Sequence, residues 1–140
     1  MSNPSPLSVP QSTVLLVEDD EMLRRMLARA LVETGVQVLL AGNGEEALSQ
    51  VRERPSSIHL AVTDISMPVM NGFEFAQALR TLDPSIPILF MTGALPAFSG
   101  GISLREVGAR MLLKPFSPTV FADVVSAMLT GGPSARRTIA

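Results

Sequence analysis

The chain has 140 residues, of which 46% are hydrophobic and 17% charged, and it carries a formal net charge of −2 and no cysteine. This apolar content excludes a disordered chain and suffices for one domain with a complete core. The slight negative charge argues against direct binding of nucleic acid, which normally needs a basic face, and without cysteine the chain has no disulfide or thiolate metal site. Its apolar runs are too short to cross a bilayer, so we expect no membrane contact.

Two terminal stretches differ in composition from the rest of the chain. Residues 1–11 contain three prolines with serines between them, which predicts a flexible tail or linker. They lack the basic and apolar regions of a secretion signal, so we expect a cytoplasmic protein. Residues 131–140 predict a second flexible tail, which leaves residues 12–130 as the folded domain.

Between the tails, short apolar runs alternate with segments of helical periodicity. The apolar runs predict strands, at residues 13–17, 36–41, 60–64, 86–92 and 109–114. The periodic segments predict helices, at residues 20–35, 43–54, 73–82 and 117–129, with a weak helix at 103–107. Asp20, Asn43 and Ser117 stand where helix N-caps are favoured. Strands alternating with helices indicate an α/β fold, a doubly wound five-stranded parallel sheet covered on both faces.

Polar side chains stand at the ends of four of these predicted strands. They are Glu18, Asp19 and Asp20 after the first strand, Asp64 at the end of the third, Thr92 at the end of the fourth and Lys114 at the end of the fifth. The carboxyl ends of parallel strands meet at one edge of the sheet, and doubly wound folds bind their ligands at that edge. We therefore expect these side chains to converge on one site.

The chemistry of this set indicates a cation and a phosphoryl group. Neighbouring carboxylates raise one another's pKa, and Mg²⁺, which prefers oxygen ligands, removes that conflict. An ammonium and a hydroxyl group beside a carboxylate suit a phosphoryl group, so Asp64 is the candidate nucleophile for an acyl phosphate. Each piece alone has an ordinary interpretation, because acids favour a helix N-terminus and a lone Asp64 can form a turn. Their joint occurrence at strand ends favours the site.

Four segments match one known family. They are LLVEDDE at 15–21, VTDISMPVMNG at 62–72, FMTG at 90–93 and GARMLLKPF at 108–116. With these segments the sequence resembles the receiver domain of response regulators in two-component signalling. The resemblance implies a flavodoxin-like three-layer sandwich with strand order 2-1-3-4-5. It also implies phosphorylation by a sensor histidine kinase or a histidine phosphotransfer protein.

The resemblance assigns the metal ligands residue by residue. Asp19 would bind Mg²⁺ directly and Glu18 would bind it through a water molecule. Ser66 would contribute its backbone carbonyl to the same ion. Asp64 would also ligate the ion and would accept the phosphoryl group from a phosphohistidine.

On the phosphoryl side, the resemblance implies roles for two further residues. Thr92 would move toward the phosphoryl group and hydrogen-bond it, while Lys114 would pair with the same group. The domain would catalyse its own phosphorylation by positioning these parts, which makes it a signalling receiver rather than an enzyme. The same resemblance leads us to expect a cis peptide between Lys114 and Pro115.

The sequence departs from the family pattern at two places. Three residues before the lysine the family usually carries Tyr or Phe, where this chain has Met111, so a flexible thioether replaces the ring expected to move with Thr92. Residues 93–108 include Pro96 and paired glycines, which predict a short or irregular fourth helix. We therefore expect residues 93–104 to be mobile and to become ordered on phosphorylation.

Two other functions compete with the receiver interpretation. A phosphatase of similar topology would place a second acid two residues after its nucleophile, where this chain has Ser66. A degenerate receiver, used only for protein contacts, would not need acids that are intact here. The single histidine, His59, stands at the start of a strand opposite the acidic edge, so we expect an exposed residue rather than a phosphotransfer group. With no effector after residue 130, we expect a stand-alone regulator or a receiver within a larger protein.

Overall fold

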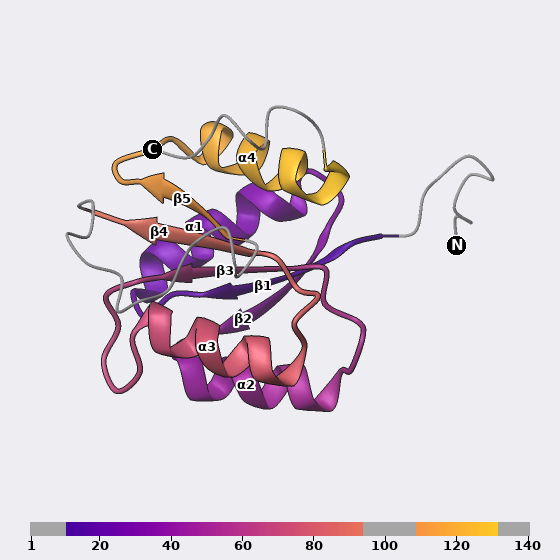
Figure 1. Ribbon diagram of the computed structural model, residues 1–140. Helices are drawn as coiled ribbons and strands as arrows, with labels where there is room; N and C mark the ends of the chain where they lie inside the picture. The colour runs from indigo at the N-terminus through magenta and orange to yellow at the C-terminus, as the bar shows by residue number, and fades with distance from the viewer. Residues whose placement is uncertain (1–10, 94–108, 132–140) are drawn as a thin grey trace.

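The computed structural model describes residues 11–93 and 109–131, and a parallel sheet forms the centre of the molecule (Figure 1). Its strands are β1 (Thr13–Val17), β2 (Gln37–Ala41), β3 (Leu60–Asp64), β4 (Ile88–Thr92) and β5 (Ala109–Leu113). They pair in the order β2-β1-β3-β4-β5, and each pairing is parallel. The predicted sheet and its strand order are confirmed.

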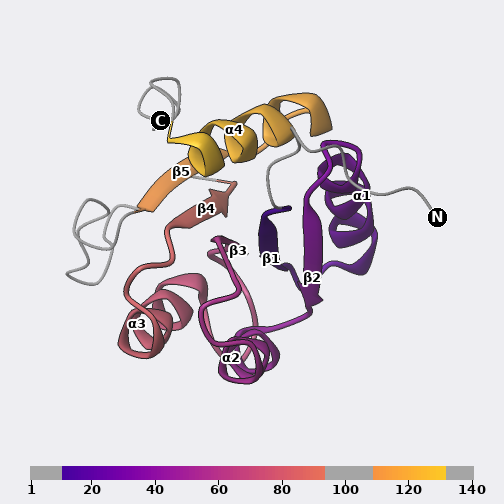
Figure 2. The ribbon, with the colours of Figure 1, turned by 90° about the vertical axis from the view of Figure 1, so that its right-hand side faces the viewer.

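Helices cover both faces of this sheet. In the described part of the chain they are α1 (Glu21–Val32), α2 (Gly44–Glu53), α3 (Gly72–Leu82) and α4 (Pro118–Thr130). Figure 2 shows α1 and α4 on one face of the sheet and α2 and α3 on the other. The result is the three-layer, flavodoxin-like sandwich that the sequence predicts.

Each helix begins at a side chain that caps its free backbone amides. Asp20, Asn43 and Ser117 accept hydrogen bonds from first-turn amides, as predicted. Asn71 caps α3 and forms a capping box with Glu74. These caps fix where each helix starts.

Some predicted bounds differ from the observed ones. The helix predicted for 20–35 ends at Val32, and Gly35 then turns the chain with a φ of +96°, which glycine adopts without strain. The strand predicted from residue 86 begins at Ile88, because the preceding Pro87 has no amide hydrogen to give to a ladder.

Other predictions fall on residues that the structure does not describe. The weak helix at 103–107, the irregular and mobile segment predicted for 93–104 except its first residue, and nearly all of the predicted tails lie there. Among the helices of residues 11–93 and 109–131, none combines the length and hydropathy that a membrane crossing needs.

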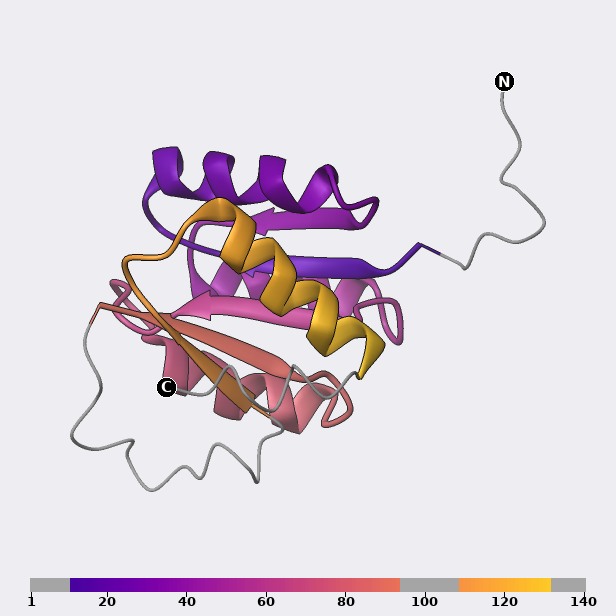
Figure 3. The ribbon, with the colours of Figure 1, turned by 90° about the horizontal axis from the view of Figure 1, so that it is seen from above.

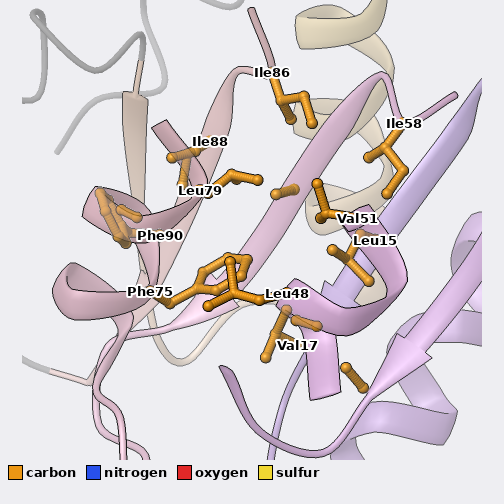
Figure 4. Packing of buried hydrophobic residues seen from close by; sticks show 14 of the residues in the cluster. Leu15, Val17, Leu48, Val51, Ile58, Phe75, Leu79, Ile86, Ile88 and Phe90 are labelled. Carbon is orange, nitrogen blue, oxygen red and sulfur yellow. The ribbon is translucent and has the colours of Figure 1, made fainter. Parts of the chain in front are cut away.

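The core consists of two apolar layers, one on each face of the sheet. Along β1, Leu15 and Val17 pack toward α2 and α3, whereas Val14 and Leu16 pack toward α1 and α4. Figure 4 shows the first layer, in which Phe75 of α3 lies among the strand side chains. Strands β1, β3 and β4 are buried along their whole length, as expected for a parallel sheet covered on both faces. This packing holds the strand ends in fixed positions.

Candidate functional site

The carboxyl ends of the strands form one edge of the sheet, because the strand arrows run in a common direction (Figure 3). Val17 is the register partner of Thr63, so the next residues, Glu18 and Asp64, stand side by side at this edge. Carboxylate oxygens of Glu18, Asp19 and Asp64 all lie within 4.8 Å of one another. Glu18 and Asp64 are buried and Asp19 is exposed. The cluster therefore reaches solvent on the Asp19 side.

The only lysine of the sequence, Lys114, completes this cluster from the end of β5. Its backbone amide donates to the Thr92 carbonyl at 2.7 Å, which continues the pairing of β4 with β5. Its Nζ atom lies 3.2 Å from Asp64 Oδ2 and 3.6 Å from Glu18 Oε1. The expected cis peptide between Lys114 and Pro115 is confirmed. A single ammonium group thus contacts both buried carboxylates.

Burial dominates the electrostatics of Glu18, whose side chain is only 1% exposed. Loss of hydration raises the pKa of Glu18 from 4.5 to about 7; the Asp20 amide and Lys114 lower it, and the charge of Asp64 adds to the rise. The Asp20 amide donates to Oε2 at 3.1 Å. The other oxygen, Oε1, is buried and accepts no hydrogen bond within residues 11–93 and 109–131. The Lys114 ammonium, 3.6 Å away, is beyond hydrogen-bond distance of this oxygen. A buried acceptor without a hydrogen bond is unfavourable, and a metal ion bound to Oε1 would remove the penalty.

These donors fit a magnesium ion. Mg²⁺ takes oxygen ligands from a small number of carboxylates and keeps several waters. The cluster offers two buried carboxylates and one exposed carboxylate, and Glu18 Oε1 has an unused acceptor position. The acidic pocket of Glu18, Asp19 and Asp64 therefore has the composition of a Mg²⁺ site.

The two remaining predicted residues lie in different surroundings, Thr92 at the end of a strand and Ser66 in a loop. Thr92 ends β4, is 7% exposed, and follows Met91, which is the register partner of Asp64. The sheet therefore fixes its position close to the cluster. Ser66 is exposed in the loop after β3, so its position depends on the conformation of that loop.

Arg24 supports the site although sequence reasoning did not identify it. Its Nη1 atom donates to the Glu18 carbonyl at 2.7 Å, which ties α1 to the end of β1. Its own amide donates to the Asp20 carbonyl at 2.8 Å, at the start of the helix. The available signal was spacing: a residue one turn after an N-cap directs its side chain back toward the preceding strand end.

His59 lies at the opposite, amino edge of the sheet. Its Nδ1 accepts a hydrogen bond from the Thr13 amide at 2.9 Å, and its own amide donates to the Thr13 carbonyl at 2.9 Å. The residue is exposed and directly precedes β3. The expectation of an exposed histidine away from the acids is confirmed, although the residue stands just outside the strand.

Met111 is buried in β5, where it is the register partner of Phe90. Its side chain belongs to the apolar layer beneath α2 and α3. The thioether therefore packs in the core at the level of Phe90, which lies two residues before Thr92 in β4.

Comparisons with known proteins agree with this geometry. A family model described as the response regulator receiver domain matches residues 14–126. The response regulator receiver protein CpdR of Brucella abortus strain 2308 is 36% identical over 116 residues, which are 83% of this chain and 95% of CpdR. The sensor kinase CckA of the same strain is 36% identical over 119 residues, which are 84% of this chain and 12% of the kinase.

Solved structures give the same result. The chemotaxis protein CheY4 of Vibrio cholerae matches with a TM-score of 0.73 and 30% identity, over 85% of this chain and 99% of CheY4.

The curated relatives differ widely in the share of their own length that this chain covers. Apart from CpdR, the chain spans 42% or less of the first curated relatives that it matches. The matched region in those longer proteins is thus one part of the whole.

Proposed function

This chain belongs to the response regulator receiver domain family, and from that premise we propose that Asp64 accepts the phosphoryl group in two-component signalling. One observation carries the choice of residue: Lys114 Nζ lies 3.2 Å from Asp64 and 3.6 Å from Glu18. Asp64 is the nearer partner of that cation, and it ends β3, the strand between β1 and β4. A phosphoryl group on Asp64 would therefore be flanked by both neighbouring strand ends.

The same proposal assigns the metal ligands. Glu18, Asp19 and Asp64, together with the backbone carbonyl of Ser66, would hold a Mg²⁺ ion. When bound, such an ion neutralises charge on the oxygens of a transferring phosphoryl group. The buried Oε1 of Glu18, which accepts no hydrogen bond from the described residues, supports this assignment, and the exposure of Asp19 leaves space for water ligands.

In the proposed transfer, a carboxylate oxygen of Asp64 attacks the phosphorus of a phosphohistidine. A P–O bond forms as the P–N bond breaks, and its electron pair stays on the imidazole nitrogen of the donor. Asp64 becomes an acyl phosphate. Lys114 would pair with the phosphoryl oxygens, and the Thr92 hydroxyl would donate a hydrogen bond to one of them. The chain contributes orientation and charge, which is how a receiver assists its own phosphorylation.

The donor in this proposal is a sensor histidine kinase or a histidine phosphotransfer protein. Receiver domains partner with histidine kinases, and one relative of this chain is named a sensor kinase. We place this exchange in the cytoplasm and take residues 12–130 as the receiver unit. A phosphatase activity is not favoured, because the exposed Ser66 stands where a second acid would be needed.

Mass spectrometry of the intact protein tests the proposal. Incubation with acetyl phosphate and Mg²⁺ should add one phosphoryl group, and Asp64→Asn should abolish the adduct. Asp123→Asn, which removes an exposed carboxylate on α4, is the matched control and should still be phosphorylated. An adduct that forms without Mg²⁺, or one that survives in Asp64→Asn, would contradict the proposal.

A further inference from the structure

The loop between β3 and α3 contains an unusual backbone conformation at Val69. This residue has a φ of +70°, and the Met70 amide donates to the Pro68 carbonyl across it at 2.7 Å. A hydrogen bond between residues two apart, with positive φ at the centre, describes a γ-turn that is rare and strained. Strain is greatest for a β-branched residue, and the Val69 side chain is 85% exposed, so its own packing cannot compensate. The flanking residues must therefore impose the turn.

On one side of Val69, the flanking residue Met70 is seated against the first residue of α2. A Cβ atom added at Gly44 would lie 2.6 Å from Met70 Sδ, 3.1 Å from its Cγ and 3.3 Å from its Cβ. Gly44 is buried, and Met70 packs on the apolar layer beneath α2 and α3. A Cβ atom there would clash with Sδ and crowd Cγ and Cβ, so any residue larger than glycine at 44 would shift Met70 in this seat.

Three residues after Val69, Gly72 lies against the backbone at the end of β3. A Cβ atom there would lie 2.4 Å from the Asp64 carbonyl oxygen and 2.8 Å from Ile65 Cα. The Gly72 amide donates to the Ile65 carbonyl at 2.8 Å. The loop is thus closed at its base beside Asp64 and held at its far side by Met70.

We propose that Met70, seated against Gly44, is a positioning residue for the metal site. It fixes the loop that carries the Ser66 carbonyl, and the strain at Val69 follows from holding Met70 in that seat. This inference rests on the proposed function, because it takes the Ser66 carbonyl as a metal ligand. It links the N-terminus of α2 to metal binding at Asp64 through one side chain.

Titration of the metal-free protein with Mg²⁺ alone tests this role. Calorimetry is the suitable readout, because the sequence has no Trp or Tyr to report binding by fluorescence. Gly44→Ala should weaken Mg²⁺ binding by about tenfold, the lower end of the loss when a residue supporting a metal ligand is removed. Its melting temperature is a separate readout, because displacing Met70 from the apolar layer costs packing while alanine favours the helix more than glycine does. A purely structural role would change stability and leave the Mg²⁺ affinity unaltered.

A double variant, Gly44→Ala with Met70→Ala, tests whether Gly44 affects the metal site through Met70. Met70→Ala should also weaken Mg²⁺ binding about tenfold. Adding Gly44→Ala to Met70→Ala should change the affinity by less than about twofold, because the side chain that the added methyl group would displace is already gone. Val69→Gly is the matched control in the same loop; it relieves the strained φ and should raise the melting temperature without changing Mg²⁺ affinity.

Amide NMR spectra give a second readout that needs no metal. In metal-free Gly44→Ala, the amides of residues 65–71 should shift, whereas those of β1 should keep their positions. Wild-type Mg²⁺ affinity in both Gly44→Ala and Met70→Ala would overturn the positioning role, even if the wild type is phosphorylated normally. Absence of Mg²⁺ binding to the wild type would overturn the proposed function and this inference together.

Discussion

At the amino edge of the sheet the polar groups are paired, whereas at the carboxyl edge a buried oxygen has no hydrogen bond. His59 and Thr13 exchange two hydrogen bonds at the amino edge, and His59 is exposed to water as well. At the carboxyl edge Glu18 Oε1 accepts no hydrogen bond from the described residues. Nearby, Val69 holds a positive φ. Two edges of one sheet, built from the same kind of strands, thus differ in how well their polar groups are hydrogen-bonded.

This difference teaches which edge is arranged for a ligand. Unpaired buried groups and backbone strain persist only where the surrounding structure enforces them, and they concentrate at functional sites. The fold contributes rigid strands to both edges, so the unfavourable features of the carboxyl edge are local. A ligand that neutralises the acids would bring the two edges closer in stability.

The largest expected effect is the dependence of the free energy of unfolding on pH that Glu18 causes. Its folded-state pKa of about 7 lies above 4.5, so between these values the folded protein binds more protons than the unfolded chain. The free energy of unfolding therefore falls as pH rises through this window, by about 3 kcal/mol at about 1.4 kcal/mol per pKa unit. Glu18→Gln should remove this fall, as measured by urea denaturation at pH 5 and pH 8 without divalent cations.

Mg²⁺ sharpens this pH test. At pH 8 it should stabilise the wild type more than at pH 5.5, because the ligand carboxylates must be deprotonated to bind a metal. It should stabilise Glu18→Gln less than the wild type at either pH. Glu53→Gln, on the exposed end of α2, is the control and should retain the wild-type slope. Equal slopes for the wild type and Glu18→Gln would contradict the assigned electrostatics.

The second test removes the cation of the carboxyl edge. Lys114→Met should slow phosphorylation by acetyl phosphate about 100-fold, because one preorganised charge on the transferring group is lost. The measurement is the initial rate of adduct formation by mass spectrometry at saturating Mg²⁺. Arg80→Met, which removes an exposed cation from α3, should keep the wild-type rate. A Lys114→Met rate within twofold of the wild type would exclude a role for this ammonium.

The third test relieves the strain in the loop after β3. Val69→Gly should raise the free energy of unfolding by about 1 kcal/mol, because glycine adopts a positive φ without steric cost and this gain exceeds its larger entropy in the unfolded chain. Val120→Ala, at an exposed position of α4, is the control and should change the free energy of unfolding little. A destabilised Val69→Gly would show that the turn is unstrained.

The smallest effect is expected at the amino edge. His59→Ala removes the acceptor of the Thr13 amide and should lower the free energy of unfolding by about 1 kcal/mol, the net value of one such hydrogen bond. Mg²⁺ affinity and phosphorylation should stay at wild-type values, because the change lies at the opposite edge. A change in either would mean that the two edges are coupled.

The fold was predictable because its signals are local. Apolar runs identified β1 and β3 with their observed bounds, and Asp20, Asn43 and Ser117 act as the caps that the sequence indicated. These features depend on neighbouring residues only. The strand order came from the family resemblance and not from any local pattern.

The acidic cluster was predictable in its members but not in its details. Glu18 and Asp19 are adjacent acids, and only the sheet decides that the first is buried while the second is exposed. The Arg24 contact with the Glu18 carbonyl joins a helix to a strand end, and the seat of Met70 against Gly44 joins the loop after β3 to the N-terminus of α2. Such contacts arise from tertiary packing, which no local pattern reports.

Chemical mapping of the phosphorylated residue tests the central claim most directly. After incubation with acetyl phosphate and Mg²⁺, reduction with borohydride converts an aspartyl phosphate into homoserine, which tandem mass spectrometry locates in the sequence. We predict homoserine at position 64 alone, and none when Mg²⁺ is removed by a chelator. Homoserine at Asp19 or Asp20 in place of Asp64, or labelling that persists without Mg²⁺, would contradict the assignment of the carboxyl edge as a magnesium-dependent phosphoacceptor site.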